Sequence, residues 1–241
     1  MQVQGSKFKV QSDASIRIPQ SPFPIPHCNS VRIGVARDEA FCFCYQDNIE
    51  LLEQAGAEII YISPLHDEQL PAGMQGLYLP GGYPELYAAG LNKNNKMREA
   101  IFSFCTSEKP VYAECGGFLY LLQAITDQGG IRHAMAGLFP AEAKMLPRLH
   151  RLGYVEAEAQ AACPFLAAGE KIRGHEFHYS AISSMPNNIM RTYSVFRRRD
   201  QAAFSEGYRI HNTLGSYMHL HFASNPDFAK DFVLKCKNKG G

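Results

Sequence analysis

The sequence holds 241 residues, enough for one α/β domain with a buried core, and its 24 basic and 23 acidic side chains nearly cancel. This balance excludes a protein that binds nucleic acid through a basic surface, and no apolar run approaches the roughly 20 residues that cross a bilayer. The first 30 residues lack a secretory signal and the seven cysteines lack paired spacing, so we expect small-molecule chemistry in the cytoplasm, with no membrane partner.

Residues 1–30 form the first segment along the chain. They mix glutamine, serine and lysine and end in prolines at 19, 22, 24 and 26, which is typical of an extended linker or N-terminal arm. The domain proper is expected to span 31–241. Its first half alternates strand and helix patterns, with buried strands at 31–36, 58–62 and 76–79, an amphipathic helix at 47–55 and a helical stretch that reaches Cys105.

The second half of the domain has a different pattern. Apolar and polar residues alternate at 152–159, 171–182 and 191–196, a strand-like run ends the segment 208–222, and a final helix runs through Cys236. We therefore predict an α/β fold, with a mostly parallel central sheet, flanking helices and antiparallel edge strands in the C-terminal half. Ligands are expected beyond the carboxyl ends of the parallel strands.

A cysteine stands at a predicted junction of strand, turn and helix. The apolar run 111–114 stops at Cys115, and a helical pattern begins after Gly116 and Gly117. The glycines allow a sharp turn, and the N-terminus of the following helix favours a thiolate. This layout is that of a nucleophile elbow, with cysteine in place of the usual serine.

Attack on an amide also needs donors for the oxyanion and a base. Gly82, in another strand-to-helix turn, and Gly116 are expected to offer backbone N–H groups as an oxyanion hole. His219 and His221 end a predicted strand on one face, and one of them is expected to reach Cys115. The glycines are also compatible with plain tight turns, and the His-x-His pair with a zinc site.

Two further groups of side chains have open interpretations. On a neighbouring predicted strand, Glu176 and His178 share one face and either line the same cleft or form a salt-linked surface. Cys42 and Cys44 share one face of a strand or loop. Packing is favoured there over metal binding, because zinc motifs normally space their cysteines two to four residues apart.

Five segments occur in an order and spacing that together carry a family resemblance. They are 36–43 with Asp47 and Asn48, 79–86, 113–117, 173–180 and 215–222. In these segments the chain resembles the glutaminase domain of cobyrinic acid a,c-diamide synthase, in the cobalamin-biosynthesis branch of the class I, triad-type glutamine amidotransferases. The resemblance runs from about residue 31 to 228 and implies a flavodoxin-like fold.

The resemblance implies that the chain hydrolyses L-glutamine. Cys115 would attack the side-chain amide to form a γ-glutamyl thioester, while His219 holds the thiolate or takes its proton and later donates a proton to ammonia. The amides of Gly82 and Gly116 would stabilise the oxyanion. Further residues expected to contact the substrate are Gly81, Tyr83 and Gly117.

The third catalytic residue stays open. The class at large places a glutamate two residues after the histidine, and His221 stands at that position here. Glu176 is the candidate for the orienting residue, with His178 and His221 as possible cleft residues. The alternatives are a Cys–His dyad or a group supplied by another domain.

The resemblance also implies a partner that uses the ammonia, an ATP-dependent synthetase that amidates carboxylates of a corrin or another tetrapyrrole. No Gly-x-x-x-x-Gly-Lys-Ser/Thr motif precedes Val31, so we expect no cofactor or metal in this chain and ATP and Mg²⁺ on a synthetase domain outside it. Two other hypotheses stay open. One is a non-catalytic domain that docks or binds a metal or tetrapyrrole, and the other is a cysteine hydrolase of the same fold that acts on another amide.

Overall fold

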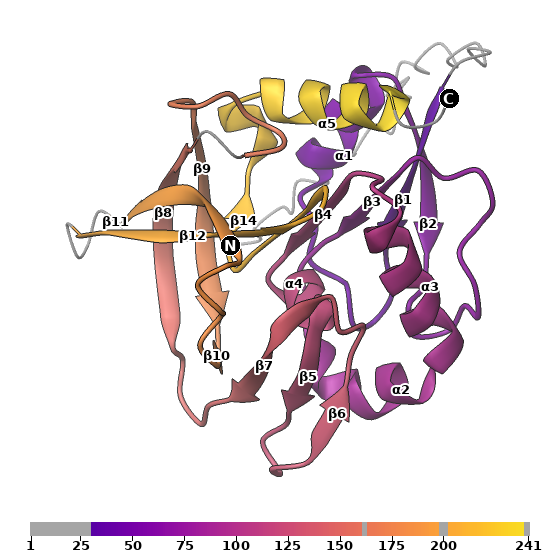
Figure 1. Cartoon of the computed structure of the whole chain (residues 1–241), viewed down its shortest axis with the longest axis vertical. Coiled ribbons are helices and arrows are strands. Elements are labelled where there is room, and N and C mark those ends of the chain that lie inside the picture. The colour runs from indigo at the N-terminus through magenta and orange to yellow at the C-terminus, as the bar shows by residue number, and fades with distance from the viewer. Residues whose placement is uncertain (1–29, 161–162, 198–201, 239–241) are drawn as a thin grey trace, which may run out of the picture.

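The computed structural model describes residues 30–160, 163–197 and 202–238, so the predicted arm, apart from Ser30, lies outside the described residues. Within them, one mixed sheet of ten strands has the order β14-β9-β8-β11-β12-β13-β4-β3-β1-β2 (Figure 1). Its parallel half consists of β2 Ala57–Ile62, β1 Val31–Ala36, β3 Gly76–Leu79, β4 Val111–Glu114 and β13 Thr213–Ser216.

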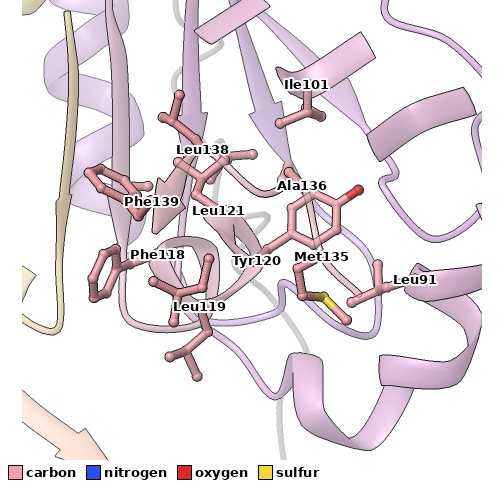
Figure 2. Close-up of a cluster of buried hydrophobic side chains, with 14 of the residues drawn as sticks. Leu91, Ile101, Phe118, Leu119, Tyr120, Leu121, Met135, Ala136, Leu138 and Phe139 are labelled. Atoms are coloured by element: carbon pink, nitrogen blue, oxygen red, sulfur yellow. The ribbon is translucent and has the colours of Figure 1, made fainter. Parts of the chain in front are cut away.

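Helices cover both faces of this parallel half, which is why its central strands are almost continuously apolar. On one face, α1 Gln46–Gln54 and α5 Asp227–Asn238 lie side by side (Figure 1). The other face carries α2 Ala88–Lys93, α3 Asn95–Thr106 and α4 Gly116–Leu121, whose apolar side chains meet in the cluster drawn in Figure 2. The predicted α/β architecture is confirmed.

The C-terminal half of the chain extends the same sheet with antiparallel strands. They are β12 Ala202–Ile210, β11 Met190–Arg197, β8 Arg151–Ala159, β9 Lys171–His178 and β14 His219–Leu220. The strands predicted at 152–159 and 191–196 are therefore confirmed. The mixed sheet places the last and shortest strand, β14, at the end of the antiparallel series.

The segment 171–182, predicted as strand throughout, divides after His178. The chain passes there from β9 into β10 Ser180–Ile182, which belongs to a different sheet. Its backbone turns so that the His178 Nδ1 lies 2.8 Å from the Ser180 carbonyl oxygen. The Tyr179 carbonyl accepts a hydrogen bond from the Leu146 N–H at 2.6 Å. Alternation of side chains continues through this corner, so the sequence pattern does not mark it.

A second, smaller sheet has the order β10-β7-β5-β6 and contains β5 Leu122–Thr126, β6 Arg132–Ala134 and β7 Phe139–Met145. Sequence analysis predicts no strand in this region. Because β5 begins directly where α4 ends, the apolar run 118–122 conceals the boundary. The strict alternation of buried and outward residues along β7 is the signal that was available.

The helical stretch predicted to reach Cys105 is divided into a 3₁₀ turn at Pro84–Tyr87, α2 and α3. The second break falls at Asn94, whose side chain caps α3 by accepting a hydrogen bond from the Met97 N–H at 3.3 Å. In the described part of the chain, no helix is long and apolar enough to cross a membrane.

Candidate active site

Cys115 lies at the carboxyl end of β4, directly before α4, with the backbone turned sharply. Its φ of 45°, with a ψ of −105°, is a positive φ that residues with a Cβ rarely adopt. The turn is held by hydrogen bonds from the Cys115 N–H to the Ser216 carbonyl at 2.8 Å and from the Gly117 N–H to the Pro80 carbonyl at 2.9 Å. A Cβ on Gly117 would collide with the Leu79 carbonyl, so only glycine fits there. The predicted elbow is thus present.

The strain at Cys115 predicts an inverted order of stability between two substitutions. Glycine normally costs about 1 kcal/mol relative to alanine, but at a positive φ it removes the clash of the Cβ. We expect Cys115→Gly to be more stable than Cys115→Ala by about 1 kcal/mol. Urea unfolding measures the difference. In the control, Ala100→Gly in α3 should lower stability, and a Cys115→Gly chain less stable than Cys115→Ala would refute the strain.

A cavity of about 310 Å³ opens at this elbow. It lies beyond the carboxyl end of β4, where the fold predicts a ligand site. Of the predicted residues, it brings together Cys115, His219, Gly82, Tyr83 and His178. The lining that sequence analysis did not assign to the site consists of Phe43, Glu85, Leu119, Met145, Leu152, His175, Phe177, Tyr179 and Ser180.

The thiol of Cys115 is almost fully buried, with 5% of the residue exposed. Its Sγ donates a long hydrogen bond of 3.7 Å to the Phe177 carbonyl oxygen. Burial raises the pKa of the Cys115 thiol, and the negative charges of Glu114 and Glu85 raise it further. The thiol is therefore protonated at neutral pH in this state.

The imidazole of His219 lies between aromatic rings at the wall of the same cavity. It stacks on His175, with ring centroids 4.7 Å apart, and meets the edge of Phe43 at 4.8 Å. Only 3% of His219 is exposed, and this burial, with His175 and His178 adding to it, lowers its pKa to about 3. The imidazole is therefore neutral at pH 7 and has a ring nitrogen that can accept a proton.

The loop that carries Gly82 is braced by the loop after β1. The Phe43 N–H donates to the Gly81 carbonyl at 3.1 Å, and the Tyr83 N–H donates to the Ala40 carbonyl at 3.0 Å. Gly82 has a φ of 154°, and a Cβ there would collide with the Ala40 carbonyl oxygen. This packing fixes the direction of the Gly82 peptide at the cavity wall.

The two predicted oxyanion donors lie side by side. A Cβ built on Gly116 would stand 2.9 Å from the Gly82 nitrogen, so these two residues are in contact, and of the two Gly82 lines the cavity. Gly81 was predicted to contact substrate, but it lies against the His219 ring, where a Cβ would collide with the imidazole. Gly117 lies beneath the elbow, with its N–H already bonded to Pro80. Neither Gly81 nor Gly117 is among the residues that line the cavity.

The candidates for the third catalytic residue lie elsewhere. Both carboxylate oxygens of Glu176 bind the Arg197 guanidinium, at 2.6 and 2.9 Å, and Glu176 does not line the cavity. Of the two predicted histidines, His219 lines the cavity and His221 does not: the backbone stays extended beyond β14, and the His221 ring meets the edge of Tyr45, with centroids 5.0 Å apart. The His221 Nε2 pairs instead with the Asp47 carboxylate at 3.0 Å on the surface.

Side chains that suggested metal binding are not gathered into a site. Cys42 is exposed, whereas burial raises the pKa of Cys44 to about 12 and its Sγ donates to the Tyr45 carbonyl at 3.6 Å. Among residues 30–160, 163–197 and 202–238, no group of three or more His, Cys, Asp or Glu side chains is arranged to hold a metal ion.

The most informative residues that sequence analysis did not place in the site are His175 and Phe177 on β9. His175 stacks on His219, and its Nδ1 lies 2.8 Å from the Tyr45 hydroxyl, while Phe177 supplies the carbonyl at the Cys115 sulfur. The pairing of His175 with His219 in adjacent antiparallel strands brings them together. The two-residue periodicity that puts 175, 177 and 179 on one face was the available signal.

Solved structures of other proteins share the fold of this chain. The structure titled PurLQS from Thermotoga maritima has a TM-score of 0.61 at 17% identity and covers 87% of this chain and 98% of that chain. A crystal structure of a glutamine amidotransferase has a TM-score of 0.60 at 15% identity, covering 85% of this chain and 98% of that chain. The fold of this chain is therefore the fold of solved class I glutamine amidotransferases.

Sequence comparison narrows this class. The profile of the CobB/CobQ-like glutamine amidotransferase domain matches residues 32–227, and the chain belongs to this family. A cobyrinate a,c-diamide synthase from Syntrophotalea carbinolica is 43% identical over 94% of this chain and 51% of its own length. One from a Synechococcus species is 46% identical over 87% of this chain and 45% of its own length. The chain spans about half the length of these curated relatives.

Proposed function

We propose that this chain is a glutaminase in which Cys115 is the nucleophile and His219 the general base. The supporting observation is that a strained, buried thiol and a neutral buried imidazole face one cavity that has Gly82 in its wall. The Cys115 sulfur attacks the side-chain carbonyl of glutamine as His219 takes the thiol proton. His219 then gives that proton to the leaving ammonia, and water hydrolyses the γ-glutamyl thioester.

The backbone N–H groups of Gly82 and Gly116 are proposed as the oxyanion donors. Gly82 lines the cavity and contacts Gly116, which directly follows Cys115, and neither nitrogen donates to another backbone carbonyl in the described residues. A donor aimed at the oxyanion is worth about 3 kcal/mol in the transition state. Tyr83 and His178, which also line the cavity, are proposed to contact the bound glutamine.

Substitution of Gly82 tests the oxyanion assignment. A Cβ there would collide with the Ala40 carbonyl and turn the peptide away, so Gly82→Ala should lower kcat for glutamine hydrolysis by about 10²-fold. Alkylation of Cys115 by a small haloacetamide does not form an oxyanion and should change far less. Gly56→Ala, with open space around its Cβ position, is the matched positive-φ control for backbone strain. Equal losses in hydrolysis and alkylation would contradict the assignment.

The product ammonia is proposed to serve a synthetase. The curated relatives are named cobyrinate a,c-diamide synthases and are about twice as long as this chain, which leaves room for a synthetase half. That half would bind ATP and Mg²⁺ and activate carboxylates of a corrin or related tetrapyrrole for amidation. L-Glutamine is then the substrate bound by this chain itself.

The experiment that tests this function measures glutamate released from glutamine by the purified chain mixed with a synthetase half from a relative. We expect release that the synthetase stimulates and that Cys115→Ala abolishes. No release, or equal release by Cys115→Ala, would contradict the proposal. Turnover of many amides without preference for glutamine or partner would instead indicate a general cysteine hydrolase, and stoichiometric metal on the purified protein would indicate a docking or metal-binding role.

A further inference from the structure

The ring of the proposed base lacks the carboxylate that would normally orient it. The His219 Nδ1 is buried and has no hydrogen-bond partner in the described residues. Glu176, the predicted orienting residue, is fully engaged with Arg197. Stacking on His175 and the edge of Phe43 restricts the ring, but neither contact fixes the backbone that carries it. The position of His219 must therefore be set mainly by the strand β14.

β14 is only two residues long and has a strand partner on one edge. There it pairs with β9, and the His221 N–H that follows it donates to the Arg173 carbonyl at 2.9 Å. The backbone polar groups on its other edge form hydrogen bonds with side chains. The Asn48 amide of α1 donates to the Leu220 carbonyl at 2.8 Å and accepts from the Phe222 N–H at 2.8 Å.

The remaining polar group on this edge, the Leu220 N–H, points to Glu114. It donates to the Glu114 Oε2 at 3.3 Å. The same carboxyl accepts hydrogen bonds from the hydroxyls of Tyr78 at 2.7 Å and Tyr112 at 2.9 Å. Glu114 is completely buried, and Asn48 also donates to the Tyr78 hydroxyl at 3.4 Å. Asn48 and Glu114 thus form one buried network, which we call the polar clamp.

The polar clamp joins the two halves of the proposed catalytic pair. Glu114 is the residue directly before the nucleophile on β4, and Leu220 is the residue directly after the base on β14. A buried carboxyl is costly, and well-packed apolar residues usually serve stability as well or better. Burial raises the Glu114 pKa to about 8, which shows how unfavourable its charge is at this place. A stabilising role alone does not account for a carboxyl here.

We propose that Glu114, together with Asn48, is a positioning group that holds His219 in register with Cys115 through the backbone of Leu220. This inference rests on the proposed glutaminase function and assigns the orienting task to a carboxyl on the nucleophile strand. Glu114 acts through the main chain of β14. It therefore orients the imidazole indirectly, in place of a carboxylate hydrogen-bonded to the ring. Neither clamp residue lines the cavity, and neither is expected to touch glutamine.

The electrostatic effect of Glu114 has the opposite sign, which makes the two roles separable. When Glu114 is ionised, its charge raises the pKa of the Cys115 thiol, so removal of the carboxyl, taken alone, would leave the thiolate fraction unchanged or increase it. Loss of positioning would remove the help of His219 and decrease the reactivity. The sign of the change therefore distinguishes them.

The test measures the rate at which iodoacetamide alkylates Cys115 at pH 7 in the whole chain, followed by mass spectrometry of the Cys115 peptide. We expect Glu114→Ala and Asn48→Ala each to slow alkylation by about tenfold, equivalent to a rise of one unit in the apparent thiol pKa. Glu114→Gln keeps an acceptor for the Leu220 N–H and should stay within about threefold of the parent. In a His219→Ala background, Glu114→Ala should have no further effect.

Two controls distinguish loss of His219 positioning from loss of folding stability. Ile101→Ala removes a fully buried side chain from α3, in the hydrophobic cluster that does not contain Tyr78, Tyr112 or Leu220, and should lower the unfolding midpoint while the alkylation rate is kept. If Glu114→Ala does not fold, the alkylation rate of Asn48→Ala tests the proposal, because that variant keeps the Glu114 carboxyl. Alkylation that is unchanged or faster in the clamp variants, or slowed equally by Glu114→Ala with and without His219, would overturn the inference.

The same data distinguish failure of the inference from failure of the proposed function. Parent and His219→Ala chains that alkylate at equal rates would contradict the Cys–His pair on which the glutaminase function rests. A parent that depends on His219, with clamp variants that behave like the parent, would contradict the positioning role of Glu114 alone.

Discussion

Cys115→Ala is expected to lower glutaminase turnover by at least about 10⁴-fold, below detection in an assay of glutamate release. The thioester cannot form without the sulfur, and neither the oxyanion donors nor His219 can replace it as the nucleophile. Alanine keeps the Cβ at the strained φ of 45°, so the fold and the substrate cavity should be retained. Circular dichroism and binding of glutamine measured by calorimetry check that the loss is chemical.

The matched control for Cys115→Ala is Cys42→Ala. Cys42 is an exposed thiol on the loop after β1 and does not line the cavity. Its removal should leave turnover within about twofold of the parent, as is usual for a surface substitution. If Cys115→Ala kept activity, or Cys42→Ala lost it, the nucleophile would be misassigned.

His219→Ala is expected to lower kcat by about 10² to 10⁴-fold, the contribution typical of a general base. The thiol of Cys115 has a raised pKa, so without the imidazole almost none of it is ionised when glutamine is bound. KM should change much less than kcat, since the ring acts on the proton rather than on substrate affinity. Steady-state kinetics with glutamine measure both constants.

His221→Ala supplies the control two residues away. Its imidazole pairs with Asp47 on the surface and contributes nothing to the cavity, so loss of the ring should change kcat by less than about twofold. This comparison separates the two histidines, which their positions on the predicted strand alone did not rank. A larger loss in His221→Ala than in His219→Ala would reverse the assignment of the base.

The parallel half of the sheet was predictable because its strands are short apolar runs separated by amphipathic helices. Strand periodicity at 31–36 and 76–79 depends only on burial by helices on both faces, which local sequence records. The corner at Tyr179 and the start of β5 were not predictable, whereas the alternation along β7 was a usable signal. Their boundaries are set by contacts with distant segments, such as that of Leu146 with Tyr179.

The candidate site also has a part that the local sequence predicts and a part that it does not. The elbow at Cys115 and the turn at Gly82 are local features, because glycines after a strand mark the backbone geometry they permit. The surroundings of His219 are not local. The stack of His175 on His219 depends on the register of β9 with β14, and the binding of Glu114 to Leu220 joins residues 106 positions apart. Sequence periodicity carries no information about such pairings.

The most direct test of the account is covalent labelling of the chain by a diazo ketone analogue of glutamine, followed by mass spectrometry of every cysteine peptide. We predict modification of Cys115 alone, slowed by L-glutamine in proportion to its concentration and absent in Cys115→Ala. Such a result requires a glutamine site and a reactive sulfur in one cavity. Labelling spread over several cysteines, or labelling of Cys115 that L-glutamine does not slow, would contradict the account.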